Sequence, residues 1–241
     1  MSIPSVRLFL LAGLPALFAT PFAWGQPIDS LPPGHWYEVP NSNLSSLDPC
    51  PARNCSYSGI EGQPAVMTNW AGGAYDSTRD RLIVWGGGHA GYAGNEVYAF
   101  DVNSLAWQRL TQPSLITAND PAPPNTTTYY ADGKPSSRHS YDYLEYAPNV
   151  DRFFSVSAAA TYGPAGGGGY GVDAFDFDTL TWSARTPVIE ASSGYSSTIG
   201  SKAIYDSATG HLWYHNCLSG NLKRYDPVSD TWANHVATYV R

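Results

Sequence analysis

The chain has 241 residues, 43% of them hydrophobic, which is enough for one large domain or two small ones with a sizeable core. Its formal net charge of -7 excludes a general electrostatic attraction to nucleic acid or to an anionic membrane surface. The 17 Tyr and 8 Trp, with 23 Gly and 19 Pro spread along the chain, are typical of many short strands joined by turns.

Residues 1–25 have the pattern of a secretory signal peptide. Arg7 supplies the positive first region, residues 8–20 are apolar, and Ala23-Trp24-Gly25 places small residues at the cleavage positions before Gln26. The apolar run is too short to span a bilayer, and no cysteine follows it that would carry a lipid anchor. We therefore expect an exported protein, secreted or periplasmic, with no membrane contact after signal removal.

Export makes the three cysteines informative, because disulfides persist in oxidising compartments. Cys50 and Cys55 flank the short loop "CPARNC", and this spacing predicts a local disulfide, with two free thiols as the alternative. Cys217 is left without a predicted partner. Paired Cys/His spacing of the kind that binds zinc does not accompany these residues, so no metal site is predicted.

A repeated pattern defines the rest of the chain. Three segments align without gaps around a tyrosine, and each reads as strand, polar turn and strand: "YDSTRDRLIVW" from Tyr75, "YAPNVDRFFSV" from Tyr146 and "YDSATGHLWYH" from Tyr205. Downstream of each, an aromatic-Asp pair precedes a tryptophan at one constant spacing: Asp101 and Trp107, Asp176 and Trp182, Asp226 and Trp232. This repetition predicts three copies of one structural unit.

Each unit reads as a four-stranded antiparallel sheet with strands a to d. The aromatic-Asp pair ends strand c, where the Asp can accept hydrogen bonds from the backbone amides of the turn, and the Trp lies on strand d. One sheet cannot bury both its faces, so we expect blades near residues 69–110, 138–185 and 196–235 to stack radially as in a β-propeller. We expect the three Trp side chains to be buried or half-buried between blades.

The motif "RLIVWGGG…NEVYAFD…LAW" resembles a kelch repeat, with an apolar strand, a double glycine, and a Tyr and a Trp at characteristic separation. "SRHSYDYLEY" is similar to the Arg- and His-containing start of a kelch strand a. The second and third copies depart from the pattern, since "SVSAAA" and "YHNCLS" replace the glycines. The resemblance implies an all-β fold of about three four-stranded, kelch-type β-propeller blades over residues 69–241, a galactose oxidase-like fold.

Residues 26–68 precede the first blade. Within them "GHWYEVPNSNL" resembles a fourth strand, so Trp36 is a candidate for a strand that closes the ring. Three blades do not form a ring, and propellers of this family usually have more. We therefore expect a partial propeller that is a fragment of a longer protein. Several copies that associate through their open blades are the alternative.

In such blades the b–c turns and the d–a connections emerge on one face, and loops on a rigid scaffold commonly carry function. The candidate catalytic residues there are His89, His139 and Arg138. The candidate substrate contacts are Tyr92, Tyr129, Tyr130, Tyr162 and His215. For His89 and His139 the alternative is a side chain hydrogen-bonded within the fold. Residues 116–135 form a long polar connection that is either a functional loop with stacking tyrosines or a mobile flap.

Two functions fit these observations. The first is an exported propeller that binds a glycan or a protein on its loop-rich face. The second is an enzyme acting on extracellular polysaccharide, such as a lyase, with His89 or His139 as base, Arg138 opposite a uronate carboxylate and a tyrosine as acid. Lys134 and Arg138 favour acidic polysaccharides as ligands. No Tyr-Cys pair for galactose oxidase chemistry aligns, and no cofactor is expected.

Overall fold

The computed structural model describes residues 30–87, 91–116, 129–156, 159–161, 172–187, 202–215 and 220–238. Residues Met1–Glu38 and Val39–Arg241 form two separate units. The predicted signal peptide lies outside the described residues. The described part of the first unit contains no strand, and its Trp36 is 96% exposed; the ring-closing strand stays a prediction. Among the described residues no helix is long and apolar enough to cross a membrane.

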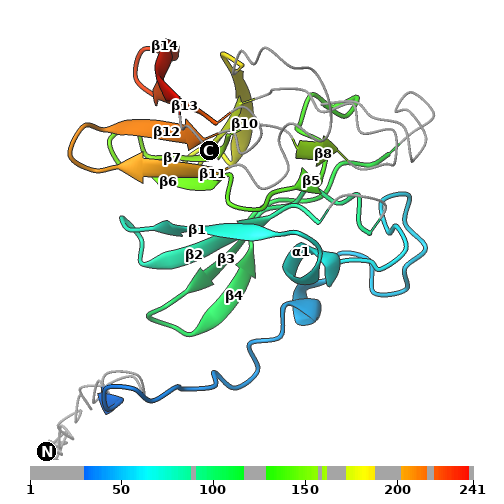
Figure 1. The fold of residues 1–241 in the computed structure, drawn as a ribbon. Helices are drawn as coiled ribbons and strands as arrows, with labels where there is room; N and C mark the ends of the chain where they lie inside the picture. The colour runs from blue at the N-terminus through cyan, green and yellow to red at the C-terminus, as the bar shows by residue number, and fades with distance from the viewer. Residues whose placement is uncertain are drawn as a thin grey trace, which may run out of the picture. The chain divides into compact units, whose positions relative to one another are not determined.

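The described part of the second unit holds three four-stranded antiparallel sheets, which we call blades 1, 2 and 3 (Figure 1). Blade 1 consists of β1 (Gly72–Asp76), β2 (Arg81–Trp85), β3 (Tyr98–Asp101) and β4 (Ala106–Arg109). Blade 2 consists of β6 (Leu144–Ala147), β7 (Arg152–Val156), β9 (Val172–Asp176) and β10 (Thr181–Arg185). Blade 3 consists of β11 (Lys202–Asp206), β12 (His211–His215), β13 (Asn221–Asp226) and β14 (Thr231–Thr238). The all-β fold is confirmed and is consistent with part of a propeller.

One strand lies elsewhere than the sequence predicted. Arg138 was expected to open strand a of blade 2, but β5 (Arg138–His139) pairs with β8 (Ala159–Thr161) in a separate two-stranded sheet. Strand a of blade 2 is β6, which begins at Leu144. The predicted start of strand a lies six residues before the observed one, because both segments carry the alternating apolar pattern that marks a strand.

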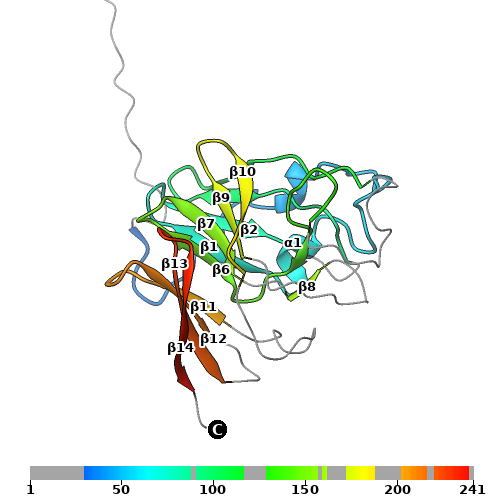
Figure 2. The same ribbon diagram turned by 90° about the horizontal axis from the view of Figure 1, so that it is seen from above.

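The blades stack through their faces. Strand a of blade 2, β6, contacts strand a of both other blades, β1 and β11 (Figure 2). One buried cluster fills the space between blades 1 and 2 and includes Trp85, Phe153 and Phe175. A second cluster fills the space between blades 2 and 3 and includes Phe154, Tyr214 and Tyr225. Burying these aromatic faces is the main stabilising contribution to the stack.

The three tryptophans occupy equivalent, half-buried places, as the repeat predicted. Each is paired across strands with the aromatic residue of strand c: Trp107 with Phe100, Trp182 with Phe175 and Trp232 with Tyr225. Each tryptophan also contacts the part of the chain that packs on the preceding side of its blade. The Trp182 ring lies 5.1 Å from the Trp85 ring of blade 1, between ring centroids. The Trp232 Nε1 donates to the Thr186 carbonyl, 2.9 Å away, at the end of blade 2.

For blade 1 the preceding element is the segment 39–71, which contains η2 (Leu44–Leu47), α1 (Ala65–Thr68) and the predicted Cys50–Cys55 disulfide. Trp107 Nε1 donates to the Ser42 carbonyl at 2.8 Å. Leu44, Tyr57 and Val66 of this segment are buried in one cluster with Tyr98. The segment thus covers the face of blade 1 that a neighbouring blade covers in the other two.

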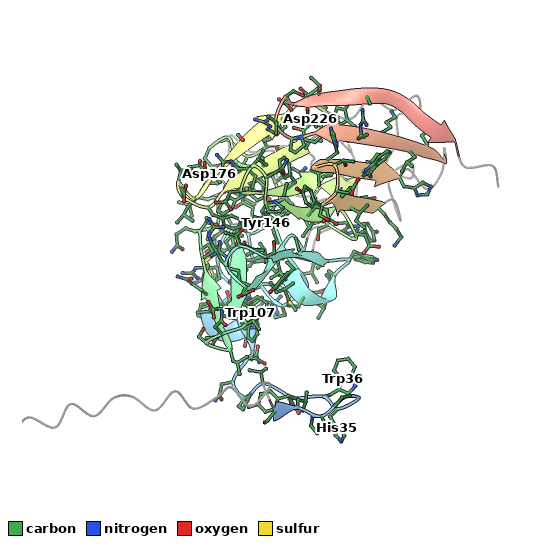
Figure 3. All side chains as sticks on the ribbon, turned by 90° about the vertical axis from the view of Figure 1, so that its left-hand side faces the viewer. His35, Trp36, Trp107, Tyr146, Asp176 and Asp226 are labelled. Atoms are coloured by element: carbon green, nitrogen blue, oxygen red, sulfur yellow. A yellow bond between two sulfur atoms is a disulfide. The ribbon has the colours of Figure 1, made fainter. Side chains whose placement is uncertain are left out.

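The hairpin turns follow one local rule. The last turn residue has a positive φ of 49° to 75° in all six described hairpins: Asp80, Leu105, Asp151, Leu180, Gly210 and Asp230. The side chains of Asp101, Asp176 and Asp226 accept hydrogen bonds from turn amides, as predicted for the ends of strand c. Figure 3 shows Asp176 and Asp226 at the ends of their strands, where the chain turns.

Strand a carries a second turn contact. The Tyr75 hydroxyl donates to Asp80 at 2.7 Å, and the Tyr146 hydroxyl donates to Asp151 at 2.6 Å. Arg79 of blade 1 also binds Asp151 with two nitrogens. The hydrogen bond from Arg79 is the largest of the effects that lower the pKa of the Asp151 carboxyl to about 2. The turn of blade 2 is thereby tied to blade 1.

Candidate functional site

The glycines after β2 have a structural role. Gly86 has φ 117° and Gly87 has φ 103°, which is the region that favours glycine. A Cβ on Gly86 would lie 2.7 Å from the Arg138 carbonyl oxygen, and one on Gly87 would lie 2.9 Å from the Val66 nitrogen. The corner therefore lets two other segments pack against blade 1. His89, the predicted catalytic histidine of this turn, lies outside the described residues.

Arg138, a predicted catalytic cation, has no exposed side-chain surface. Its Nη1 lies 3.0 Å from Asp173 Oδ2, and the Asp173 side chain is also fully buried. The Tyr129 hydroxyl donates to the other oxygen of Asp173 at 2.8 Å, and the guanidinium lies 5.4 Å from the centre of the Trp85 ring. Burial, with the Asp173 charge, raises the pKa of Tyr129. These contacts join blade 1, blade 2 and the long connection between them.

His139, the other predicted catalytic residue described here, is 1% exposed. Its ring packs on Trp70 with 4.5 Å between ring centroids, and its Nδ1 lies 3.1 Å from the Tyr141 hydroxyl oxygen. His139 and a tyrosine are thus within hydrogen-bonding reach, but His139 is buried, and Tyr141 is half-buried.

The remaining predicted tyrosines are also engaged. The buried Tyr92 donates its hydroxyl to Glu96 Oε1 at 2.7 Å, as Tyr98 does. Burial raises the pKa of the Glu96 carboxyl. The buried Tyr130 donates to the Ala93 carbonyl at 2.6 Å. Tyr162 lies outside the described residues. The structure does not gather the described candidates into one cleft.

An open pocket of about 450 Å³ lies where strands a of the three blades meet. Its polar and aromatic lining comes from the segment before β6, from β6 and from blade 3: Asp142, Glu145, Lys202, Trp213 and His215. Gly73, Leu144, Ala203, Ile204 and Leu222 complete it. Lys202 opens β11 and His215 ends β12, so the pocket lies at the end of the blades where the b–c turns and d–a connections emerge. Of the predicted site residues that the structure describes, His215 is the one that lines this pocket.

Two carboxyl groups and one ammonium group set the charge of the pocket. Lys202 forms an ion pair with Asp142, and the Ala203 amide donates to the Asp142 carbonyl at 2.7 Å, which fixes the start of β11 beside the segment before β6. Burial raises the pKa of the Glu145 carboxyl to about 7, and the Asp142 charge adds to the rise. A hydrogen bond from the Tyr205 backbone opposes it. Glu145 therefore titrates near neutral pH.

Asp142, Glu145, Lys202 and Trp213 were not predicted as site residues. A signal for one of them exists in the sequence, because Glu145 is a charged residue inside the otherwise apolar strand "YLEYA". Asp142 and Lys202 lie 60 residues apart in the chain and give no local signal. The described residues include no group of three His, Cys, Asp or Glu side chains that would hold a metal ion.

Comparisons with known proteins add little to this picture. No family model and no curated protein matches the chain. A crystal structure of a structural genomics protein of unknown function from Bacteroides thetaiotaomicron VPI-5482 is similar, with 10% sequence identity and a TM-score of 0.42. The match covers 67% of this chain and 32% of that protein, so this chain spans about a third of its length.

Proposed function

We propose that this chain is an exported, kelch-type propeller segment that binds a glycan in the pocket where strands a of the three blades meet. The kelch assignment is supported by the Gly86-Gly87 corner, with its two positive φ angles, and by Tyr98 and Trp107 in the first blade. Export is supported by the pattern of residues 1–25 and, more weakly, by the Cys50–Cys55 disulfide.

The observation that carries the proposal is the composition of the pocket. The indole of Trp213, with Ile204 and Leu222, offers an apolar surface to the C–H face of a sugar ring. Asp142, Glu145, Lys202 and His215 offer donors and acceptors for hydroxyl groups. A volume of about 450 Å³ lies within the range of ligand sites, and a few polar groups in an apolar lining are typical of them.

The charges in the fold argue against an acidic polysaccharide and against the lyase alternative. Arg138 is buried against Asp173, and Lys134 lies 3.2 Å from Asp132. Both cations that favoured acidic ligands are therefore already balanced by carboxylates. A lyase site needs a cation that is free to neutralise a uronate, so binding without bond cleavage is the better supported function.

The proposal is tested by calorimetric titration with soluble oligosaccharides. Trp213→Ala should weaken binding about five- to thirtyfold, because stacking on one aromatic ring contributes on the order of 1–2 kcal/mol. Trp36→Ala, the same change at a fully exposed tryptophan of the other unit, is the matched control and should bind as the wild type does. Binding that is unchanged in Trp213→Ala contradicts the proposed site. Ultraviolet absorbance from an unsaturated product would instead establish the lyase function.

A further inference from the structure

We infer that the pocket prefers a glycan carrying a protonated amino group, such as a de-N-acetylated hexosamine, with Glu145 as the carboxylate that binds the ammonium. This inference rests on the proposed function and names its ligand class. It follows from the charge balance of the pocket and from the position of the indole.

The first step concerns the positively charged side chains near Glu145. Lys202 lines the same pocket, but it is already paired with Asp142. Among the described residues no lysine or arginine forms an ion pair with Glu145. The internal stretches outside the described residues contain no lysine or arginine in their sequence. Within the described part of the chain Glu145 thus has no lysine or arginine as an ion-pair partner, and the other groups of the pocket that can carry a positive charge are the ammonium of Lys202, paired with Asp142, and the imidazole of His215.

The second step is the cost of that arrangement. The ionised form of the half-buried Glu145 carboxyl is disfavoured without a positive partner, and the neighbouring Asp142 charge disfavours it further. Burial, with the Asp142 charge, raises the pKa of Glu145 accordingly. A ligand ammonium would provide the missing partner and favour the ionised carboxylate, and charge-assisted hydrogen bonds are roughly twice as strong as neutral ones.

The third step is the indole of Trp213, the aromatic side chain in the lining of the pocket. Trp213 lines the same pocket as Glu145, so a sugar that occupies the pocket meets an aromatic surface as well as the carboxyl group. Indole is the side chain that attracts cations most strongly through its face. An anionic sugar would instead meet Asp142 and Glu145 with one ammonium, Lys202, already engaged. The pocket therefore discriminates by charge in the direction of cationic ligands.

The test compares three tetrasaccharides by isothermal titration calorimetry at pH 7 and low salt: the glucosamine tetramer, the N-acetylglucosamine tetramer and cellotetraose. The wild type should bind the glucosamine tetramer about tenfold tighter than its N-acetylated form. Glu145→Gln should reduce that ratio to about one, and Glu145→Asp, which keeps the charge, should retain a preference. Glu61→Gln, the same change at an exposed carboxylate outside the pocket, should leave the ratio unchanged. Circular dichroism of each variant establishes that it is folded.

The outcomes separate the two proposals. If cellotetraose or the N-acetylated tetramer binds as tightly as the glucosamine tetramer, or if the preference survives in Glu145→Gln, the charge inference is wrong while glycan binding stands. If none of the three binds the wild type, both the inference and the glycan site are wrong. A preference that falls as salt is raised supports the ion pair, because salt screens an open site.

Discussion

Arg138 offers the sharpest test of whether polar residues on this face serve the fold or a ligand. Its side chain and that of Asp173 are both fully buried, with 3.0 Å between Nη1 and Oδ2. Replacing Arg138 by Met leaves the Asp173 carboxylate buried without its cation, which costs about 3–5 kcal/mol of unfolding free energy. For a domain of this size that corresponds to a fall in Tm of roughly 6–20 °C.

The double variant Arg138→Met/Asp173→Leu separates the ion pair from packing. It removes both charges, so it should recover most of the lost stability and remain within about 1–2 kcal/mol of the wild type. The remaining loss reflects the Tyr129 hydroxyl, which donates to Asp173 at 2.8 Å and would lose its acceptor. Lys134→Met is the control, because its pair with Asp132 is about 40% exposed and should contribute less than about 1 kcal/mol.

The assay is urea unfolding followed by tryptophan fluorescence, combined with oligosaccharide titration at low temperature, where the variants are folded. We expect Arg138→Met to be strongly destabilised and to bind ligand as the wild type does. An Arg138→Met protein with wild-type stability and no ligand binding or turnover would refute the structural role and restore Arg138 as a residue that contacts substrate.

Three further predictions follow from named contacts. Trp182→Phe should cost less stability in urea unfolding than Trp107→Phe, because Trp107 donates to Ser42 whereas nothing among the described residues accepts from the Trp182 indole nitrogen; equal costs would contradict this. Gly86→Ala should lower Tm by clearly more than Gly133→Ala, since both have positive φ but only Gly86 lacks room for a Cβ. The pKa of Glu145 rises from 4.5 to about 7 on folding, so the unfolding free energy of the wild type, relative to that of Glu145→Gln, should fall as pH rises from about 4.5 to 7 and stay constant above; a relative stability that does not change with pH would contradict the raised pKa.

The blades could be predicted because their determinants are local. The pairing of Phe100 with Trp107 and the cap at Asp101 depend on residues within one hairpin, and the same rule recurs in the other two blades. Stacking followed from the need of each sheet to cover its faces. The covering of blade 1 by segment 39–71 was not predicted, because an irregular segment has no periodic pattern that reveals what it packs against.

The site could not be predicted in the same way, because the exposure of a polar residue depends on partners that are distant in the sequence. Arg138 meets Asp173, 35 residues away, and Lys202 meets Asp142, 60 residues away. The chemistry of Arg138 alone fits a catalytic cation and a buried ion pair equally well. Only the packing of blade 1 on blade 2 decides between them, and it places the guanidinium inside the fold.

The ion pairs of the fold bear on which ligands the chain can bind, because they engage most of its positively charged side chains. Only 14% of the residues are charged and acids outnumber bases. Most of the described lysines and arginines form ion pairs with aspartates, at hairpin turns such as Asp151 or between blades as at Asp173. Such pairs stabilise the stack, but they leave few cations for an anionic ligand. Among the described residues Glu145 has no ion-pair partner, and it lines a pocket that also presents an indole; these two observations are the basis of the preference we infer for a positively charged ligand.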